Sequence, residues 1–206
     1  MGAKVLLADP YNLKPEDSVE FRLVYEGLLL GASNTKNRSD HKHAIRKVFH
    51  EQLKVLWEKN SALDQWPSWE MNRRRSMRDR LAEHFKHNNV SYVPLSWDGL
   101  GVACRLDILM LRPESPGQTL IRGGDIDNRL KTLFDALRMP KIGEVAEEPD
   151  SGANPFYCLL QDDSLINHLS VTTDLLLQDS DPNNVKLVIS VNLWPITYNN
   201  LNMGVF

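Results

Sequence analysis

The most regular apolar pattern in this sequence is a short segment that follows two glycines and two aspartates. Leu130, Leu133, Phe134 and Leu137 stand at positions i, i+3, i+4 and i+7, the spacing that places apolar side chains on one face of an α-helix. Pro140 cannot continue a helix and is expected to end it. The segment therefore predicts an amphipathic helix that must bury its apolar face against another layer of the fold.

Segments typical of β-strands lie on both sides of this helix. The first half of Val19–Leu30, VEFRLVYEGLLL, alternates apolar and polar residues, and Val102–Leu111 reads VACRLDILML. After the helix, Leu165–Leu177 and Val185–Leu193 are predicted as strands separated by the turn residues SDPNN. Strands on both sides of a helix favour a sheet covered by helices.

Two further helices are predicted nearer the N-terminus. Asp40–Lys59 has apolar residues at helical spacing, with Asp40 as a candidate cap, and a second helix is expected over Trp69–His87. The acidic stretch Lys141–Pro155 contains Gly and Pro and is predicted as a loop. The order of elements, β-α-α-β-α-β-β, predicts an α/β protein of one domain with a mixed β-sheet packed with helices.

Composition narrows the class of protein. The net charge of −3 and the pI of about 6.1 argue against a general nucleic-acid coat protein, which is usually basic. The two cysteines, Cys104 and Cys158, are far apart and do not indicate a zinc ribbon or a disulfide framework. We find no signal peptide, no myristoylation signal and no apolar stretch long enough for a membrane span, so we expect a cytoplasmic protein without a membrane partner.

Four carboxylates on two predicted elements form the candidate metal site. Asp125 and Asp127 follow Gly123-Gly124 at the start of the amphipathic helix, and Asp162 and Asp163 precede a predicted strand. Oxygen ligands from separate elements are what Mg²⁺ or Mn²⁺ prefers. Such a metal neutralises the charge of a phosphodiester and helps to generate hydroxide from water.

Each of these residues also has a structural interpretation. Asp127 could cap the helix, and the two adjacent aspartates could form a solvated turn. Lys131 stands four residues after Asp127, where it could contact a scissile phosphate or form an i,i+4 ion pair with that aspartate. A D-x-D pair alone is a weak signal.

The combination of these motifs resembles the RusA family of Holliday-junction resolvases, which are crossover junction endodeoxyribonucleases. The match lies in DIDNRLKTLFDAL followed by QDDSLI, within Val102–Val171. The resemblance implies a RusA-like nuclease domain over residues 1–206 in which Asp125, Asp127 and Asp163 bind Mg²⁺, with Mn²⁺ as a substitute. Asp162 would support them, Lys131 would be the catalytic lysine, and a homodimer would make two opposed cuts in branched DNA.

The chain departs from the RusA pattern in three places. The acidic stretch KIGEVAEEPDSGANPFY lengthens the segment between the second and third carboxylates, and a basic segment, Asn60–Asn89, has no counterpart. Insertions are therefore expected at about 60–89 and 139–158. Where the family has a run of arginines before D-x-D, this chain has IRGG and retains Arg122 alone. The same site could therefore serve a nuclease for another nucleic-acid structure, or a DNA-structure-binding protein without turnover.

Basic residues in two segments are candidate phosphate contacts. The run NRRRSMRDR and the stretch TKNRSDHKHAIRK stand out in an acidic chain. The candidates for nucleic-acid binding are Arg73, Arg74, Arg75, Arg78, Lys36, Arg38 and Arg122, with Lys42 and Arg46 also within reach of DNA. The alternative for the arginine run is a solvated helix face whose arginines pair with Glu70, Asp79 and Glu83.

Histidines, tryptophans and the C-terminal tail have mainly structural interpretations. His41, His43 and His50 lack the spacing of a zinc motif and are expected at the surface or as caps. The tryptophans Trp57, Trp66, Trp69 and Trp97 could stack on bases, but we expect them to pack in the core or an interface. The tail LWPITYNNLNMGVF is a candidate dimer interface that could equally pack on its own subunit.

Overall fold

The computed structural model describes residues 18–31, 38–64, 76–87, 89–113, 125–144, 153–178, 181 and 183–203, with the side chain of Asp125 left aside. Its helices are α1 (Arg38–Lys59), α2 (Met77–His84) and α4 (Asp125–Leu137), with short 3-10 turns η2 (Ser61–Asp64), η3 (Asp98–Leu100) and η4 (Asp163–Leu165). Its strands are β1 (Val19–Leu28), β2 (Lys86–His87), β3 (Val90–Ser96), β4 (Val102–Arg112), β5 (Phe156–Leu160), β6 (Ile166–Leu175) and β7 (Asn184–Pro195).

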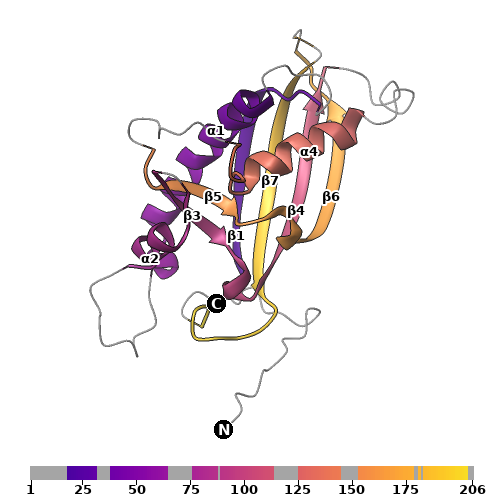
Figure 1. Ribbon diagram of the computed structural model, residues 1–206. Helices are drawn as coiled ribbons and strands as arrows, with labels where there is room; N and C mark the ends of the chain where they lie inside the picture. The colour runs from indigo at the N-terminus through magenta and orange to yellow at the C-terminus, as the bar shows by residue number, and fades with distance from the viewer. Residues whose placement is uncertain are drawn as a thin grey trace.

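The larger sheet of the described residues has four strands in the order β1-β7-β4-β6 (Figure 1). β7 pairs antiparallel with both β1 and β4, whereas β4 and β6 run parallel. Alternation along β7 is complete, with Val185, Leu187, Ile189, Val191 and Leu193 buried and the residues between them partly exposed. This period of two places one face of the sheet in the core and leaves the other to solvent.

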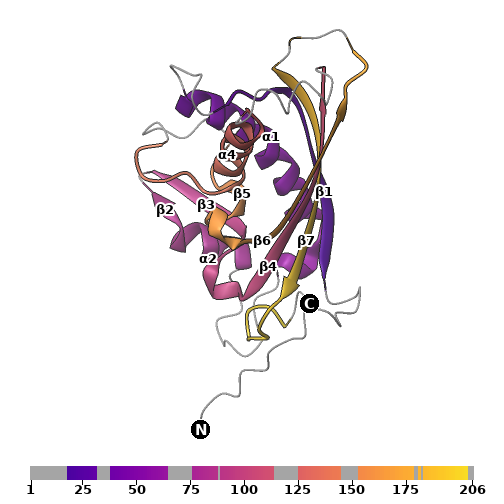
Figure 2. The ribbon, with the colours of Figure 1, turned by 90° about the vertical axis from the view of Figure 1, so that its right-hand side faces the viewer.

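Both long helices cover the same face of this sheet. Figure 2 shows α1, α4 and the smaller sheet on one side of the four strands. α1 packs against β1, β5 and α4 through a stripe that includes Ile45, Phe49, Leu53 and Trp57. The predicted α/β fold of one domain, with a mixed sheet packed with helices, is therefore confirmed.

A smaller sheet of three strands, in the order β2-β3-β5, lies between α1 and α2. β3 and β5 are parallel, and all five residues of β5 are buried. Neither strand was expected, because both are buried on two faces and so lack the alternation that identifies a half-buried strand.

The predicted helix over Trp69–His87 is wrong at its C-terminal end, and its first residues lie largely outside the described ones. Ser76 caps α2 by accepting a hydrogen bond from the amide of Asp79, so the helix begins at Met77. Lys86 and His87 form β2 instead of a last helical turn. Asp40 is also misplaced as a cap, since α1 begins two residues earlier at Arg38.

The segments expected as insertions contribute to the core. Leu63, Met77, Leu81 and Phe85 from the first are buried. β5, whose first residues belong to the second, is buried throughout. Removing either segment would uncover the rest of the hydrophobic core.

The C-terminal tail folds back on its own chain. The side-chain amide of Asn202, which is fully buried, donates to the carbonyl oxygens of Leu100 and Thr197. Gly101 faces this tail with a φ of +66°, and a Cβ there would lie 2.6 Å from the Thr197 hydroxyl, so only glycine fits. Of the two interpretations of the tail, packing on its own subunit is what the described part shows.

Candidate active site

The first turn of α4 contains the residues Asp125 and Asp127 of the candidate site. Because α4 begins at Asp125, Asp127 lies inside the helix and is not its N-cap. A carboxylate in the first turn interacts favourably with the helix dipole. Lys131 lies one turn further along, and its Nζ is 2.9 Å from Oδ2 of Asp127.

This ion pair is open to solvent. The side chains of Lys131 and Asp127 are 60% and 69% exposed, and an exposed i,i+4 pair contributes only about 0.3–0.5 kcal/mol. The i,i+4 ion pair considered for Lys131 is thus present. Because the pair is weak and exposed, both side chains remain accessible to a phosphate or a metal ion.

The second pair of carboxylates lies in the turn between β5 and β6. Asp162 is the N-cap of η4, and its Oδ1 accepts a hydrogen bond of 3.1 Å from the amide of Ser164. Hydrogen bonds from Ser164 are the main cause that lowers the pKa of Asp162, and the positive charges of Lys141 and Arg138 add to the effect. Asp163, the first residue of η4, is exposed.

Asp162 and Asp163 therefore have different surroundings, although neither lies in a strand. Asp162 is engaged by its own turn, whereas Asp163 projects from an exposed position. This difference follows from the position of Asp162 as the cap of the 3-10 turn. It is compatible with Asp163 as the ligand and Asp162 as a supporting residue.

The fold brings the two elements together, since α4 packs against η4. Leu130 of α4 and Leu165 of η4 both pack against the core, and Figure 1 shows α4 crossing the face of the sheet above η4. Among the side chains that the structure describes, no group of three His, Cys, Asp or Glu residues could hold a metal ion. The predicted set includes the side chain of Asp125, which lies outside those described.

A group of buried charged residues lies next to α4. We define the buried charge cluster as Lys42, Arg46, Asp135, Arg138 and Glu144. Lys42 Nζ lies 3.1 Å from Asp135 and 3.2 Å from Glu144, and Arg46 Nη2 lies 3.3 Å from Glu144. Arg138 pairs with both carboxylates. The three cations are almost fully buried, and such charges are stable only when paired.

The buried charge cluster connects α1, α4 and the segment after α4 to the end of β5. The amide of Met139 donates to the carbonyl of Leu160, two residues before Asp162, and Arg138 forms a β-bridge with the same leucine. Sequence reasoning missed this group. The available signal was the i,i+3 spacing of the opposite charges Asp135 and Arg138, together with the two cations Lys42 and Arg46 one turn apart on α1.

Glu144 is the residue whose ionisation the cluster controls. Burial alone would raise its pKa, but hydrogen bonds from Arg138, from the backbone amide of Lys141 and from Lys42 outweigh burial and hold the pKa at about 2. The carboxylate therefore stays charged throughout the ordinary pH range.

Several of the predicted DNA contacts have carboxylate partners within the protein. Lys42 and Arg46 cannot reach DNA, because both are buried in the charge cluster. Arg78 Nη2 lies 2.7 Å from Asp64, a partner that the sequence analysis did not identify. The hydrogen bond to Asp64 is the main cause that raises the pKa of Arg78.

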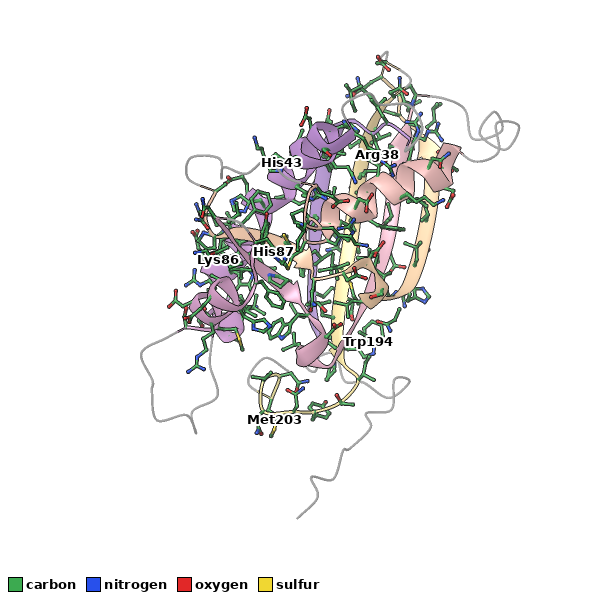
Figure 3. All side chains as sticks on the ribbon, in the orientation of Figure 1. Arg38, His43, Lys86, His87, Trp194 and Met203 are labelled. Carbon is green, nitrogen blue, oxygen red and sulfur yellow. The ribbon has the colours of Figure 1, made fainter. Side chains whose placement is uncertain are left out.

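Arg38 is the predicted DNA contact that the structure describes as accessible. It begins α1 beside α4, with a side chain 47% exposed and 3.9 Å from Asp135 (Figure 3). The remaining candidates lie outside the described residues: Lys36, Arg73, Arg74, Arg75 and Arg122.

The other sequence interpretations concern aromatic residues and cysteines. His50 is buried in the core and not at the surface, where it was expected, whereas Trp57 is buried as expected. Trp66 and Trp69 lie outside the described residues, and Trp97 packs against the core. Cys104 and Cys158 are both free and buried, and burial raises the pKa of each thiol to about 12.

Comparisons with known proteins add no relative. No protein-family model, no curated protein and no solved structure matches the chain. Within the described part of the chain, none of the helices has the length and apolar character needed to cross a membrane.

Proposed function

We propose that this chain is a Mg²⁺-dependent endodeoxyribonuclease of the RusA Holliday-junction resolvase type that acts on branched DNA. The observation that carries the proposal is the exposed Asp127–Lys131 pair on α4, held against the turn that presents Asp163. Carboxylates and a lysine from two packed elements are the groups that phosphodiester hydrolysis requires. The D-I-D-N and Q-D-D-S-L-I motifs supply the same residues in the RusA order.

Each residue has a separate role in this proposal. Asp125, Asp127 and Asp163 would hold the metal ion, Mg²⁺ or Mn²⁺, through hard oxygen ligands. The metal supplies a Lewis acid and a water of lowered pKa. Asp162 holds the η4 turn in place through Ser164, and Lys131 leaves Asp127 to stabilise negative charge on the phosphate.

The proposal includes a homodimer in the cytoplasm. A four-way junction has two opposed strands to cut, and a two-fold dimer supplies two equivalent sites. Two free cysteines suit a reducing compartment.

Cleavage of a substrate panel tests the proposal. The panel contains a four-way junction, a fork, a flap, a duplex and a single strand, each with Mg²⁺, Mn²⁺ or EDTA. We expect metal-dependent cleavage of the junction first. Cleavage of another member of the panel would support the nuclease activity and assign it a different DNA substrate. Binding without cleavage would indicate a DNA-structure-binding protein.

Variants of the carboxylates test the site itself. Asp127→Asn and Asp163→Asn should each lower cleavage by roughly a hundredfold or more while junction binding is retained, since Asn keeps the shape and loses the charge. Asp162→Asn should have a smaller effect. Asp107→Asn, which removes a carboxylate on the opposite face of the sheet, is the matched control. Wild-type cleavage rates in both Asp127→Asn and Asp163→Asn would refute the assignment.

A further inference from the structure

The two edges of the four-stranded sheet differ in how they are covered. At the β1 edge, the side-chain amide of Gln52 on α1 mimics a neighbouring strand. Its Oε1 accepts from the amide of Val24 at 2.9 Å, and its Nε2 donates to the carbonyl of Val24 at 2.7 Å. Gln52 thus occupies the outward-facing amide and carbonyl of Val24 at this edge.

The other edge of the sheet, β6, has no such cover among the described residues. β6 pairs only with β4, and Figure 1 shows it as the outermost strand on the side away from α1. Its ten residues, INHLSVTTDL, include no Lys, Arg or Pro, the residues by which proteins commonly protect an edge. Leu169 and Leu175, on the helix side of the sheet, are 41% and 37% exposed.

The hydrogen bonds to β4 show which groups of β6 face outward. The amide of Leu176 donates to the carbonyl of Arg112, whose register partner is Leu175. In a parallel pair, this pattern directs the N–H and C=O groups of even-numbered β6 residues toward β4. Those of Leu169, Val171 and Thr173 therefore point away from the sheet, where a further strand would bind.

We propose that β6 pairs antiparallel with β6 of a second copy of this chain, about a two-fold axis at Val171, to form one continuous eight-stranded sheet. This inference extends the homodimer part of the proposed function and does not require that the protein cleaves DNA. An antiparallel pair about a two-fold axis is isologous, so one surface serves both subunits. Six backbone hydrogen bonds are available, two from each facing pair of Leu169, Val171 and Thr173.

A histidine–aspartate pair across the axis selects this register. With Val171 opposite the partner's Val171, His168 faces the partner's Asp174, and Ser170 faces the partner's Thr172, all on the open face of the sheet. These even-numbered positions are the non-hydrogen-bonded pairs, at which facing side chains are closest. A shift by two residues places Asp174 opposite Ile166 or Ser170, and the charge pairs are lost.

The pairing also has a consequence for the candidate site. A two-fold axis normal to the joined sheet keeps α4 and η4 of both subunits on the same side. Two equivalent sites would then face one DNA molecule.

Analytical ultracentrifugation and hydrogen exchange test this surface directly. We expect a dimer mass, with slow amide exchange in the peptide that covers Leu169–Thr173. Thr173→Pro removes an outward N–H without touching the pairing to β4 and should give a folded monomer, whereas Thr173→Ala keeps the N–H and should remain a dimer. A monomer mass for the wild type at every concentration, or a dimer unaffected by Thr173→Pro, would overturn the proposal.

A charge exchange provides a second test that does not depend on proline. His168→Glu and Asp174→Lys each alter two cross-subunit pairs and should raise the dimer dissociation constant by about tenfold. The double variant restores opposite charges across the axis and should return the constant to within about threefold of the wild type. Absence of this recovery would exclude the register. Cleavage by the wild type is measured separately, so failure of the dimer and failure of the nuclease proposal are distinguishable.

Discussion

Two histidines act as hydrogen-bond acceptors for backbone amides in this structure. Nε2 of His41 accepts from the amide of Leu30 at 3.1 Å, and Nδ1 of His50 accepts from the amide of Tyr157 at 2.8 Å. Burial lowers the pKa of both histidines. A protonated nitrogen cannot accept, so both hydrogen bonds require the neutral imidazole.

This requirement predicts loss of stability in mild acid. In the folded state the pKa of each histidine lies below the ordinary value of about 6.5. The stabilisation from the two hydrogen bonds is therefore fully present above pH 6.5, and it is lost as the pH falls from 6.5 through the folded pKa. Urea unfolding of the wild type should therefore give a lower free energy at pH 5.5 than at pH 7.5. The variant His41→Gln/His50→Asn, which keeps acceptors that do not titrate, should show a smaller difference, whereas His84→Asn, at an exposed position, should behave as the wild type. An equal pH dependence in all three would contradict this role.

Lys131 provides a prediction that separates chemistry from stability. Since its pair with Asp127 is exposed, Lys131→Ala should change the melting temperature by less than about 2 °C. If the lysine stabilises phosphate charge, cleavage should fall by at least about tenfold. Lys186→Ala, which breaks an exposed pair with Glu26, is the control for loss of a surface lysine. Unchanged cleavage with lower stability would return Lys131 to a structural role.

At the scale of elements, Asp64 joins η2 to the start of α2. Its Oδ1 accepts from the backbone amide of Arg78, and its Oδ2 pairs with the guanidinium of the same residue. The aspartate thus satisfies one of the amides that the first turn of a helix leaves unpaired. Arg78, which the arginine run suggested as a DNA contact, thus has an intramolecular partner as well.

Asp64→Ala should therefore lower the free energy of unfolding by about 1–2 kcal/mol. Arg78→Ala should lower it less, by about 0.5–1 kcal/mol. The double variant should cost less than the sum, because both changes remove the same ion pair. Chemical unfolding measures all three, and filter binding to a junction should show no change in Arg78→Ala. A marked loss of junction affinity in that variant would restore Arg78 to the DNA site.

The buried charge cluster predicts a second effect at the scale of elements. Glu144→Gln leaves Lys42, Arg46 and Arg138 with only one carboxylate, Asp135, and should cost about 1–2 kcal/mol after allowance for solvent at this partly exposed group. The pKa of Glu144 is about 2 in the folded protein and about 4.5 in the unfolded chain. The stabilisation by its carboxylate is therefore fully present above pH 4.5 and is lost as the pH falls from about 4.5 to 2. Unfolding curves for wild type and Glu144→Gln should converge across that range; parallel curves would contradict the assignment.

At the scale of the whole molecule, described residues between α1 and β3 contribute to the core. Met77 is 1% exposed and packs in the same core cluster as Trp57 and Tyr157. Met77→Ala should cost about 2–5 kcal/mol. Met203→Ala, at an exposed position in the C-terminal turn (Figure 3), should cost almost nothing. If the two variants unfold alike, residues 61–87 are a dispensable insertion.

The sequence by itself determined the elements whose pattern is local. β1, β4 and β7 and the helices α1 and α4 were predicted because each has one buried face, and a period of two or 3.6 records that face directly. β6 was predicted as well, although none of its residues is buried. The adjacent carboxylates and Lys131 were found for the same reason, since one helix turn sets their spacing.

Only the tertiary structure decided the rest. β3 and β5 are buried on both faces, so their runs carry no period, and Lys42 and Arg46 are buried because Asp135 and Glu144, far along the chain, neutralise them. The burial of a cation or of a strand depends on which distant residues surround it. No local pattern records those partners, and they exist only when the chain is folded.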